Sequence, residues 1–177
     1  MIAELKLAEQ PWSVLHFSPA KALAPNMRAL AKLSYTTTDY ETPHEDRQYD
    51  ITNIPEPDAH FDLVLCYHVL EHIPDDRKAM AELYRITKPG GLVLAQVPHR
   101  EVPTDEDPSI SDPAIRLERF GQDDHVRWYN REDFVDRLSE AGFEVEQLNY
   151  AQQLSEEVQT RNVLRSEEII FVCRKLA

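Results

Sequence analysis

Residues 61–98 read FDLVLCYHVLEHIPDDRKAMAELYRITKPGGLVLAQVP, and this stretch decides the fold. It opens with a continuous apolar run over 61–70, as a parallel strand covered on both faces requires. A helix is predicted over 74–88, and a second apolar strand follows at 91–98. The buried face of that helix is predicted, at helical spacing, to comprise Ala79, Met80, Leu83 and Ile86. This order of strand, helix and strand indicates a parallel sheet covered by helices.

The rest of the chain continues the alternation of strands and helices. Asn130 is a typical N-cap residue, and Gly142 is a typical helix stop. The further predicted elements are a strand at 12–17, a helix from Pro25 through Leu33, a strand at 33–40, a helix at 130–142, and two closing strands at 143–151 and 167–175. The two closing strands can pair in antiparallel fashion. The expected fold is therefore α/β, with a mostly parallel sheet and helices on both faces.

Three segments fall outside this alternation. Residues 1–12 form a short N-terminal segment. Residues 39–62 are acidic and carry prolines, which predicts an exposed loop with a short third strand before or around Asp50-Ile51. Residues 99–125 are also acidic and show little periodicity, and so long a connection is typical of a lid or a substrate-binding loop. We expect all 177 residues to belong to one domain.

The composition excludes two classes of partner. The chain has 19 lysine and arginine residues against 32 aspartate and glutamate residues, a formal net charge of −13. Such a charge repels phosphate backbones and anionic lipid surfaces, so neither nucleic acid nor membrane is an expected partner. Cys66 and Cys173 lie inside apolar runs and are expected in the core of a reduced protein. With no export signal or membrane span visible, we expect a cytoplasmic protein.

Polar and aromatic side chains follow the predicted strands at the points where a ligand would bind. In sheets of this type, ligands sit outside the carboxyl ends of the strands, near the point where strand order reverses. Asp39 ends the second strand and can accept both hydroxyls of a ribose, although it can equally start a turn. The side chains at or just past the strand ends are His16, Phe17, Ser18, Pro19, Lys21, Asp39, Asp50, Tyr67, His68, Glu71, His72, Pro98 and His99.

With these residues in view, the chain resembles a known family. The segment 61–98, with its VLEHI and KPGG pieces, resembles the middle of the class I S-adenosylmethionine-dependent methyltransferases, type 11-like. Residues 124–148, DHVRWYNREDFVDRLSEAGFEVEQL, resemble the part that follows, so the similarity covers most of 13–175. The resemblance implies a Rossmann-like, seven-stranded, mostly parallel sheet whose last strand is antiparallel. It also implies S-adenosylmethionine as the cofactor, bound at the carboxyl ends of strands one to four.

The resemblance assigns roles to particular residues. Asp39 matches the acid that holds the cofactor's ribose, and Asp50 with Ile51 matches the pair around the adenine. Asp62, which opens the strand at 61–70, is given a structural role. The residues matching the strand exit under the methionine part of the cofactor are Cys66, Tyr67 and His68.

The loop after the first strand departs from the common pattern of that family. An acid followed by alternating glycines is replaced by His16, then Ser18, Ala20 and Ala22. The sequence HFSPA resembles a minority branch with a His-Phe-Ala-Pro-Glu loop, with Ala20 in place of the glutamate. The contacts expected from this loop to the cofactor come from His16, Phe17, Ser18, Pro19 and Lys21.

The missing glycines discriminate between cofactors. A dinucleotide lays its pyrophosphate against bare backbone N–H groups, for which the glycine pattern is close to necessary. S-adenosylmethionine carries a carboxylate instead, which a hydroxyl or a cation such as Lys21 can meet. The loop therefore disfavours a nicotinamide reductase much more than a methyltransferase.

Three histidines are the candidate catalytic residues: His72, His99 and His125. Methyl transfer needs the nucleophile and the methyl group aligned in a dry site, and a base is required only for a protonated nucleophile. Alternatively, His72 caps or packs at a helix start, and His125 anchors the strand before the next helix. His44 and His60 lie in the acidic loop and are expected at the surface.

Arg127 and Tyr129 are the candidate substrate-binding residues, because they follow the predicted lid in the cluster DDHVRWY. Arg127 could equally neutralise the aspartates at 123–124. No metal site is expected, since the cysteines lie far apart and no paired histidine spacing accompanies them. The acid clusters at 105–107 and 123–124 are expected to be solvated loop charge.

These features favour an S-adenosylmethionine-dependent methyltransferase that methylates oxygen or nitrogen of a small-molecule acceptor. The first predicted strand begins near the start of the chain, so we expect the lid, a homodimer or a partner subunit to close the N-terminal side of the site. The alternative is a non-catalytic member of the fold that binds a nucleoside or serves as a partner subunit.

Overall fold

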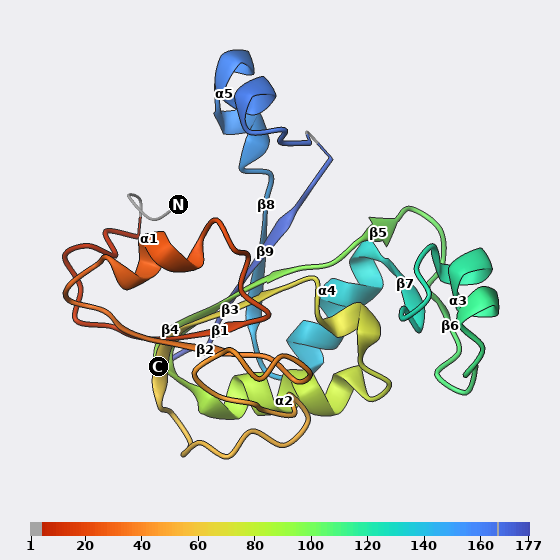
Figure 1. Cartoon of the computed structure of the whole chain (residues 1–177), viewed down its shortest axis with the longest axis horizontal. Coiled ribbons are helices and arrows are strands. Elements are labelled where there is room, and N and C mark those ends of the chain that lie inside the picture. Colours follow the sequence, from red (N-terminus) through yellow and green to blue (C-terminus); the bar gives the residue numbers. More distant parts are fainter. Residues whose placement is uncertain (1–4, 166) are drawn as a thin grey trace.

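The computed structural model describes residues 5–165 and 167–177 and is built around a central sheet (Figure 1). The strand order is β2-β1-β3-β4-β9-β8. The strands are β1 (Ser13–Phe17), β2 (Ser34–Thr38), β3 (Phe61–Tyr67), β4 (Thr87–Gln96), β8 (Glu144–Leu148) and β9 (Ile170–Arg174). The neighbours from β2 to β4 pair in parallel, whereas β9 is antiparallel to both β4 and β8. The predicted α/β fold with an antiparallel last strand is confirmed.

The central sheet has six strands within the described residues, not the seven that the resemblance implies. The third strand expected around Asp50-Ile51 is a turn. The carboxylate of Asp50 closes it, because Oδ1 accepts hydrogen bonds from the backbone N–H and the hydroxyl of Thr52, both at 2.8 Å. An isolated parallel bridge between Thr38 and Arg47 lies beside β2 at this edge. The local side-chain bonds of the aspartate thus replace strand pairing.

Helices cover both faces of the sheet, as predicted. The helices α2 (Asp76–Ile86) and α4 (Arg131–Glu140) pack on one face, and the short α1 (Ala24–Arg28) packs on the other (Figure 1). The predicted buried face of α2 is confirmed for all four residues. α1 is shorter than predicted, although Leu30 and Leu33 beyond its end still pack against the same core.

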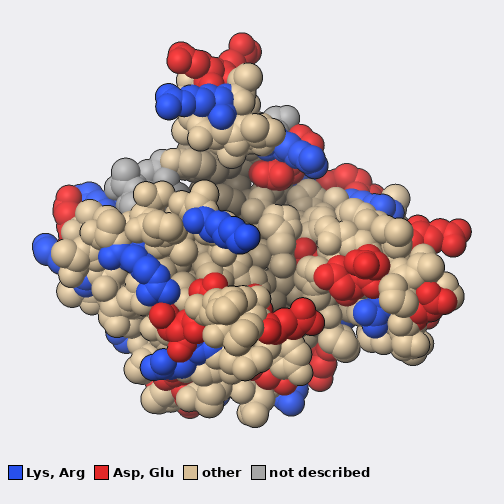
Figure 2. Space-filling model, in the orientation of Figure 1, with Lys and Arg blue, Asp and Glu red and all other residues tan. Residues whose placement is uncertain are grey.

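The segment 99–125 is more ordered than the predicted loop. It forms β5 (His99–Arg100), β6 (Asp105–Glu106) and α3 (Pro113–Phe120), and β7 (Arg127–Asn130) joins the two strands in a second sheet of order β5-β7-β6. Asp112 caps α3 through a bond from the N–H of Ala114, and Gly121 ends it at a φ of +83°. Figure 1 shows this unit beside the main sheet, and acidic side chains gather over it in Figure 2.

The remaining elements are small. The 3₁₀ turn η1 (Leu70–His72) follows β3, and η2 (Ala151–Gln153) precedes α5 (Glu156–Arg161). α5 has no buried residue and projects away from the sheet (Figure 1). Among the described residues, no helix has the length and apolar character needed to cross a membrane.

Candidate functional site

A cleft of about 620 Å³ opens at the carboxyl ends of β1, β2 and β3. This is where the strand order reverses, because the chain leaves β1 toward β2 on one side and returns to β3 on the other. The cleft is lined by Phe17, Ser18, Asp39, Tyr40, Glu41, Tyr49, Asp50, Ile51, Thr52, His68, Val69, His72, Ile73, Pro74, Asp75, Arg116 and Asp124. Its volume lies in the range typical of sites for small molecules.

The glycine-free loop after β1 adopts a glycine-like backbone at one position. Ser18 has a φ of +44°, and its N–H donates to the carbonyl of Thr38 at 2.8 Å. This bond fastens the first loop to the end of β2. A serine in this conformation costs about 1–2 kcal/mol that glycine would avoid, and its hydroxyl provides a polar group in return. Ser18 therefore supplies both the backbone shape and a hydrogen-bonding group at the cleft.

Asp39 lines the cleft and also holds its own turn. Its Oδ1 accepts hydrogen bonds from the backbone N–H groups of Glu41 and Thr42, both at 2.8 Å. Burial acts to raise the pKa of Asp39, but these bonds and those from the Ser18 and Thr42 side chains lower it below its ordinary value. The carboxylate is therefore ionised near neutral pH and can accept further bonds at the cleft. The turn expected as the alternative is present.

Two residues expected near the adenine form another part of the cleft wall. Asp50 and Ile51 both line it, and Ile51 is buried while Asp50 is exposed. Beside them, Tyr49 donates from its hydroxyl to Oε1 of Glu56 at 2.6 Å. This wall thus presents an apolar side chain and a carboxylate next to each other.

The exit from β3 carries a group of ionisable side chains. His68 has a φ of +54°, and its Nδ1 lies 3.4 Å from Oε1 of the buried Glu71. The hydrogen bond with Glu71 raises the pKa of His68 above its ordinary value, against the effect of burial. The imidazole of His72 stands edge to face against His125, with ring centroids 4.6 Å apart. The pKa of His125 is lowered mainly by burial and, to a smaller extent, by the neighbouring imidazole of His72.

Several residues expected at the cofactor do not line the cleft. Strand alternation turns His16 and Tyr67 toward the α1 face, where their rings pack edge to face. Cys66 is buried in the core beneath α2, and burial raises the pKa of its thiol. Pro19 and Lys21 lie on the turn after β1, outside the cleft lining.

Of the three candidate catalytic histidines, one lines the cleft and two do not. His72 lines the cleft, and its Nδ1 lies 3.2 Å from Oδ2 of Asp124. His125 lies behind it and is buried. His99 is on β5, outside the cleft lining, and its ring packs edge to face with Phe171.

The structure buries Arg127 and Tyr129, the candidate substrate-binding residues, in a structural network. The guanidinium of Arg127 donates to the carbonyls of Leu70 and Pro74 at 3.0 Å, and also to that of Ile73. Neither of these side chains lines the cleft.

The same network ties together elements that are distant in the sequence. The hydroxyl of Tyr129 donates to Oδ2 of Asp76 at 2.6 Å, and Arg127 donates to Oε2 of Glu106 at 3.0 Å. Arg137 of α4 bonds both carboxylates, at 2.8 Å to Asp76 and 3.0 Å to Glu106. Hydrogen bonding from Arg137, opposed by burial and aided by Arg127, lowers the pKa of Glu106 to about 2. The network therefore fastens the second sheet to α2 and α4.

Sequence reasoning missed part of the cleft wall. Arg116 comes from α3, inside a segment interpreted as loop, and Asp124 was interpreted as solvated charge. The signal for α3 was available, because SDPAIRLERFG places a cap before the helix, a proline at its first position and a glycine after it. Tyr40 and Glu41, which directly follow Asp39, also line the cleft.

The fold and the cleft at the switch point define a class of α/β proteins that bind small molecules. Comparison with known proteins names the family, since the sequence pattern described as "Methyltransferase domain" matches residues 3–148. The chain therefore belongs to the methyltransferase-domain family and is a class I S-adenosylmethionine-dependent methyltransferase domain.

Two curated relatives give the sequence similarity. A probable S-adenosylmethionine-dependent methyltransferase of Mycolicibacterium smegmatis is 33% identical over 100 residues, which is 56% of this chain and 35% of that protein. A demethylmenaquinone methyltransferase of Streptomyces avermitilis is 31% identical over 108 residues, or 53% of this chain and 47% of that protein. The matched part of the chain thus spans less than half the length of either relative.

Solved structures share the fold at low sequence identity. A putative methyltransferase from Bacillus halodurans has a TM-score of 0.63 at 16% identity, covering 99% of both chains. A 1,6-didemethyltoxoflavin N1-methyltransferase from Burkholderia thailandensis, solved with S-adenosylhomocysteine, has a TM-score of 0.65 at 13% identity, covering 99% of this chain and 75% of that one. A putative methyltransferase of Haloferax volcanii, solved in complex with the methyltransferase activator Trm112, has a TM-score of 0.67 at 16% identity, covering 99% of this chain and 89% of that one.

Proposed function

We propose that this chain binds S-adenosylmethionine in the cleft and transfers its methyl group to oxygen or nitrogen of a small-molecule acceptor. The observation that carries the proposal is the ionised carboxylate of Asp39 at the carboxyl end of β2, facing a cleft of about 620 Å³. Both of its backbone bonds end on Oδ1, and the two hydroxyls of a ribose would compete for the carboxylate with the side-chain hydroxyls of Ser18 and Thr42. Family membership supports the choice of cofactor.

The cofactor supplies a methyl group on a sulfonium sulfur, and the residues of this chain bind and orient the two reactants. Asp39 would hold the ribose, and Ile51 with Asp50 would lie against the adenine. Ser18 and His68 stand at the exits of β1 and β3, where the methionine part would lie. Arg116 and Asp124 from the segment 99–125 would face the acceptor, which makes this segment the proposed substrate loop.

A second candidate is a non-catalytic member of the fold that binds a nucleoside, alone or as a partner subunit. The observation in its favour is that Asp39 already makes two hydrogen bonds within its own turn. Cofactor binding separates the two candidates, because the enzyme requires affinity for both S-adenosylmethionine and its demethylated product.

Titration calorimetry with S-adenosylmethionine and S-adenosylhomocysteine tests the proposal. We expect saturable binding of both at one site, weakened about 5- to 150-fold in Asp39→Asn, because the amide nitrogen cannot accept a hydrogen bond from a ribose hydroxyl. The asparagine Oδ1 can still accept from Glu41 and Thr42, so the turn is kept.

Asp136→Asn is the matched control, since Asp136 is exposed on α4 and outside the cleft. It should bind both ligands as the wild type does. If folded protein gives no heat of binding at millimolar ligand, the proposal that this chain is a methyltransferase enzyme is refuted. Unchanged affinity in Asp39→Asn would mean that the ribose lies elsewhere.

A further inference from the structure

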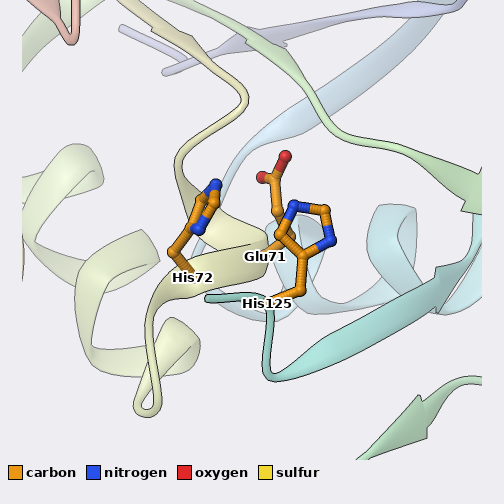
Figure 3. Close-up of side chains that lie close together, drawn as sticks. All are labelled: Glu71, His72 and His125. Atoms are coloured by element: carbon orange, nitrogen blue, oxygen red, sulfur yellow. The ribbon is translucent and has the colours of Figure 1, made fainter. Parts of the chain in front are cut away.

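Three side chains of metal-binding type lie close together (Figure 3), and one of them, His72, lines the cleft. Glu71 and His72 come from η1, and His125 comes from the residues just before β7. One ligand atom of each lies within 4.8 Å of the others. The backbone holds the two segments together, because the N–H of Val126 donates to the carbonyl of Glu71 at 3.0 Å. The fold thus places a carboxylate and two imidazoles at one point.

Two of these side chains are buried with an unmet hydrogen-bonding atom. Glu71 is 1% exposed and His125 is 2% exposed. Oε2 of Glu71 and Nε2 of His125 have no hydrogen-bond partner among the described residues. Oε1 of Glu71 lies 3.4 Å from Nδ1 of His68, and within the same part of the chain no lysine or arginine forms an ion pair with Glu71. A buried carboxylate oxygen without a partner is costly, so the site is incomplete as it stands.

The other ring nitrogen of each histidine, Nδ1, lies close to an oxygen of a neighbouring residue. Nδ1 of His125 lies 3.3 Å from the carbonyl of Phe120, and Nδ1 of His72 lies 3.2 Å from Oδ2 of Asp124. Histidines that bind metals almost always donate their other ring N–H to a carbonyl or carboxylate in this way. When Nδ1 of His125 donates to Phe120, Nε2 carries a free lone pair.

We propose that Glu71, His72 and His125 bind one divalent transition-metal ion of the Zn²⁺ type. Two imidazoles and one carboxylate suit such an ion, whereas Mg²⁺ and Ca²⁺ prefer oxygen ligands alone. Ligand atoms in a tetrahedral zinc site lie about 3.4 Å apart, so small side-chain rotations would close the present arrangement. Because the ion would bind Oε2 of Glu71 and the lone pair on Nε2 of His125, it accounts for both unpartnered atoms.

The position of the site has a consequence for the cleft. His72 and Asp124 both line the cleft, so the ion would sit in its wall, with three protein ligands and room for a further one. His72 would then serve as a metal ligand rather than as a catalytic base. The ion site rests on these contacts alone and does not depend on cofactor binding.

Titration of the full, metal-free chain with Co²⁺, followed by its visible absorption, tests the proposal. We expect the bands of a four- or five-coordinate ion, saturating at one equivalent per chain and abolished by competing Zn²⁺. His72→Ala and Glu71→Gln should each weaken binding about tenfold or more. At one concentration of Zn²⁺, the melting temperature should rise more in the wild type than in the variants.

His44→Ala is the matched control, because His44 is exposed and outside the cluster. It should bind Co²⁺ as the wild type does. His72 is only partly buried, so His72→Ala carries the test if Glu71→Gln fails to fold, with circular dichroism as the check. The proposal is overturned by wild-type protein that shows no saturable band, or by His72→Ala that binds with unchanged affinity. Calorimetry of the metal-free chain with S-adenosylhomocysteine keeps this result separate from the question of cofactor binding.

Discussion

Which side of the sheet each residue of β1 faces is decided by strand alternation, one residue at a time. Phe17 reaches the cleft, whereas its neighbour His16 faces α1 and lies 2.6 Å, through Nδ1, from the hydroxyl of Tyr35. His16 is 1% exposed, and burial lowers its pKa from 6.5 to about 4. The imidazole is therefore neutral in the folded protein, and its role is structural.

This burial makes the stability of the protein depend on pH. Between pH 6.5 and about 4 the unfolded chain protonates His16 while the folded chain does not, so stability falls as pH is lowered. The free energy of unfolding should drop by about 2 kcal/mol from this group between pH 7 and pH 5. His16→Asn keeps an acceptor for Tyr35 but cannot titrate, and it should lack this part of the pH dependence in urea denaturation.

His60→Asn is the control, because it removes an exposed histidine by the same substitution, and the fall in stability due to the burial of His16 should remain in it. Equal pH dependence in wild type and His16→Asn would mean that His16 is protonated in the folded protein.

Single residues also mark the limit of sequence reasoning at the site. Asp39 was predictable, because an acid at the end of the second strand has a recognised place beside the first turn. The left-handed backbone of Ser18 and His68 was not, since these residues rarely adopt it and only the surrounding contacts impose it.

At the scale of elements, the second sheet and α3 changed the interpretation of the segment 99–125. Acidic composition favoured a loop, although the cap and stop residues of α3 were readable. The short strands β5 and β6 were not readable, because each has two residues and depends on pairing with β7. Burial of Arg127 follows from the same docking, which no local pattern reveals.

The ion network that docks these elements should be essential for stability. Arg137→Met leaves the carboxylates of Asp76 and Glu106 without one of their cations, and removing one partner of a buried ion pair costs about 3–5 kcal/mol. Urea denaturation measures this cost. The matched control is Arg77→Met, whose pairing with Glu140 is exposed on both sides and should contribute less than about 1 kcal/mol.

Similar losses for the two variants would contradict this account. They would mean that Arg127 alone neutralises both carboxylates, or that the second sheet is only loosely docked on α2 and α4.

At the scale of the whole molecule, the segment 61–98 was enough to predict the sheet, because one strand-helix-strand unit specifies parallel pairing and handed connections. The edge beyond β2 was not predictable, since the turn at Asp50 competes locally with a strand. The cluster of Glu71, His72 and His125 was not predictable either. Glu71 and His72 are adjacent, but α2, β4, β5, β6 and α3 separate them from His125, and only the folded chain brings the three together.

The central claim is that the cleft at the ends of β1, β2 and β3 binds the nucleoside of S-adenosylmethionine through Asp39. A crystal structure of the chain with S-adenosylhomocysteine tests it most directly. The account predicts both ribose hydroxyls within about 2.5–3.2 Å of the carboxylate oxygens of Asp39, with the adenine against Ile51. A nucleoside bound outside this cleft, or a ribose held by other residues while Asp39 contacts only its own turn, would contradict it.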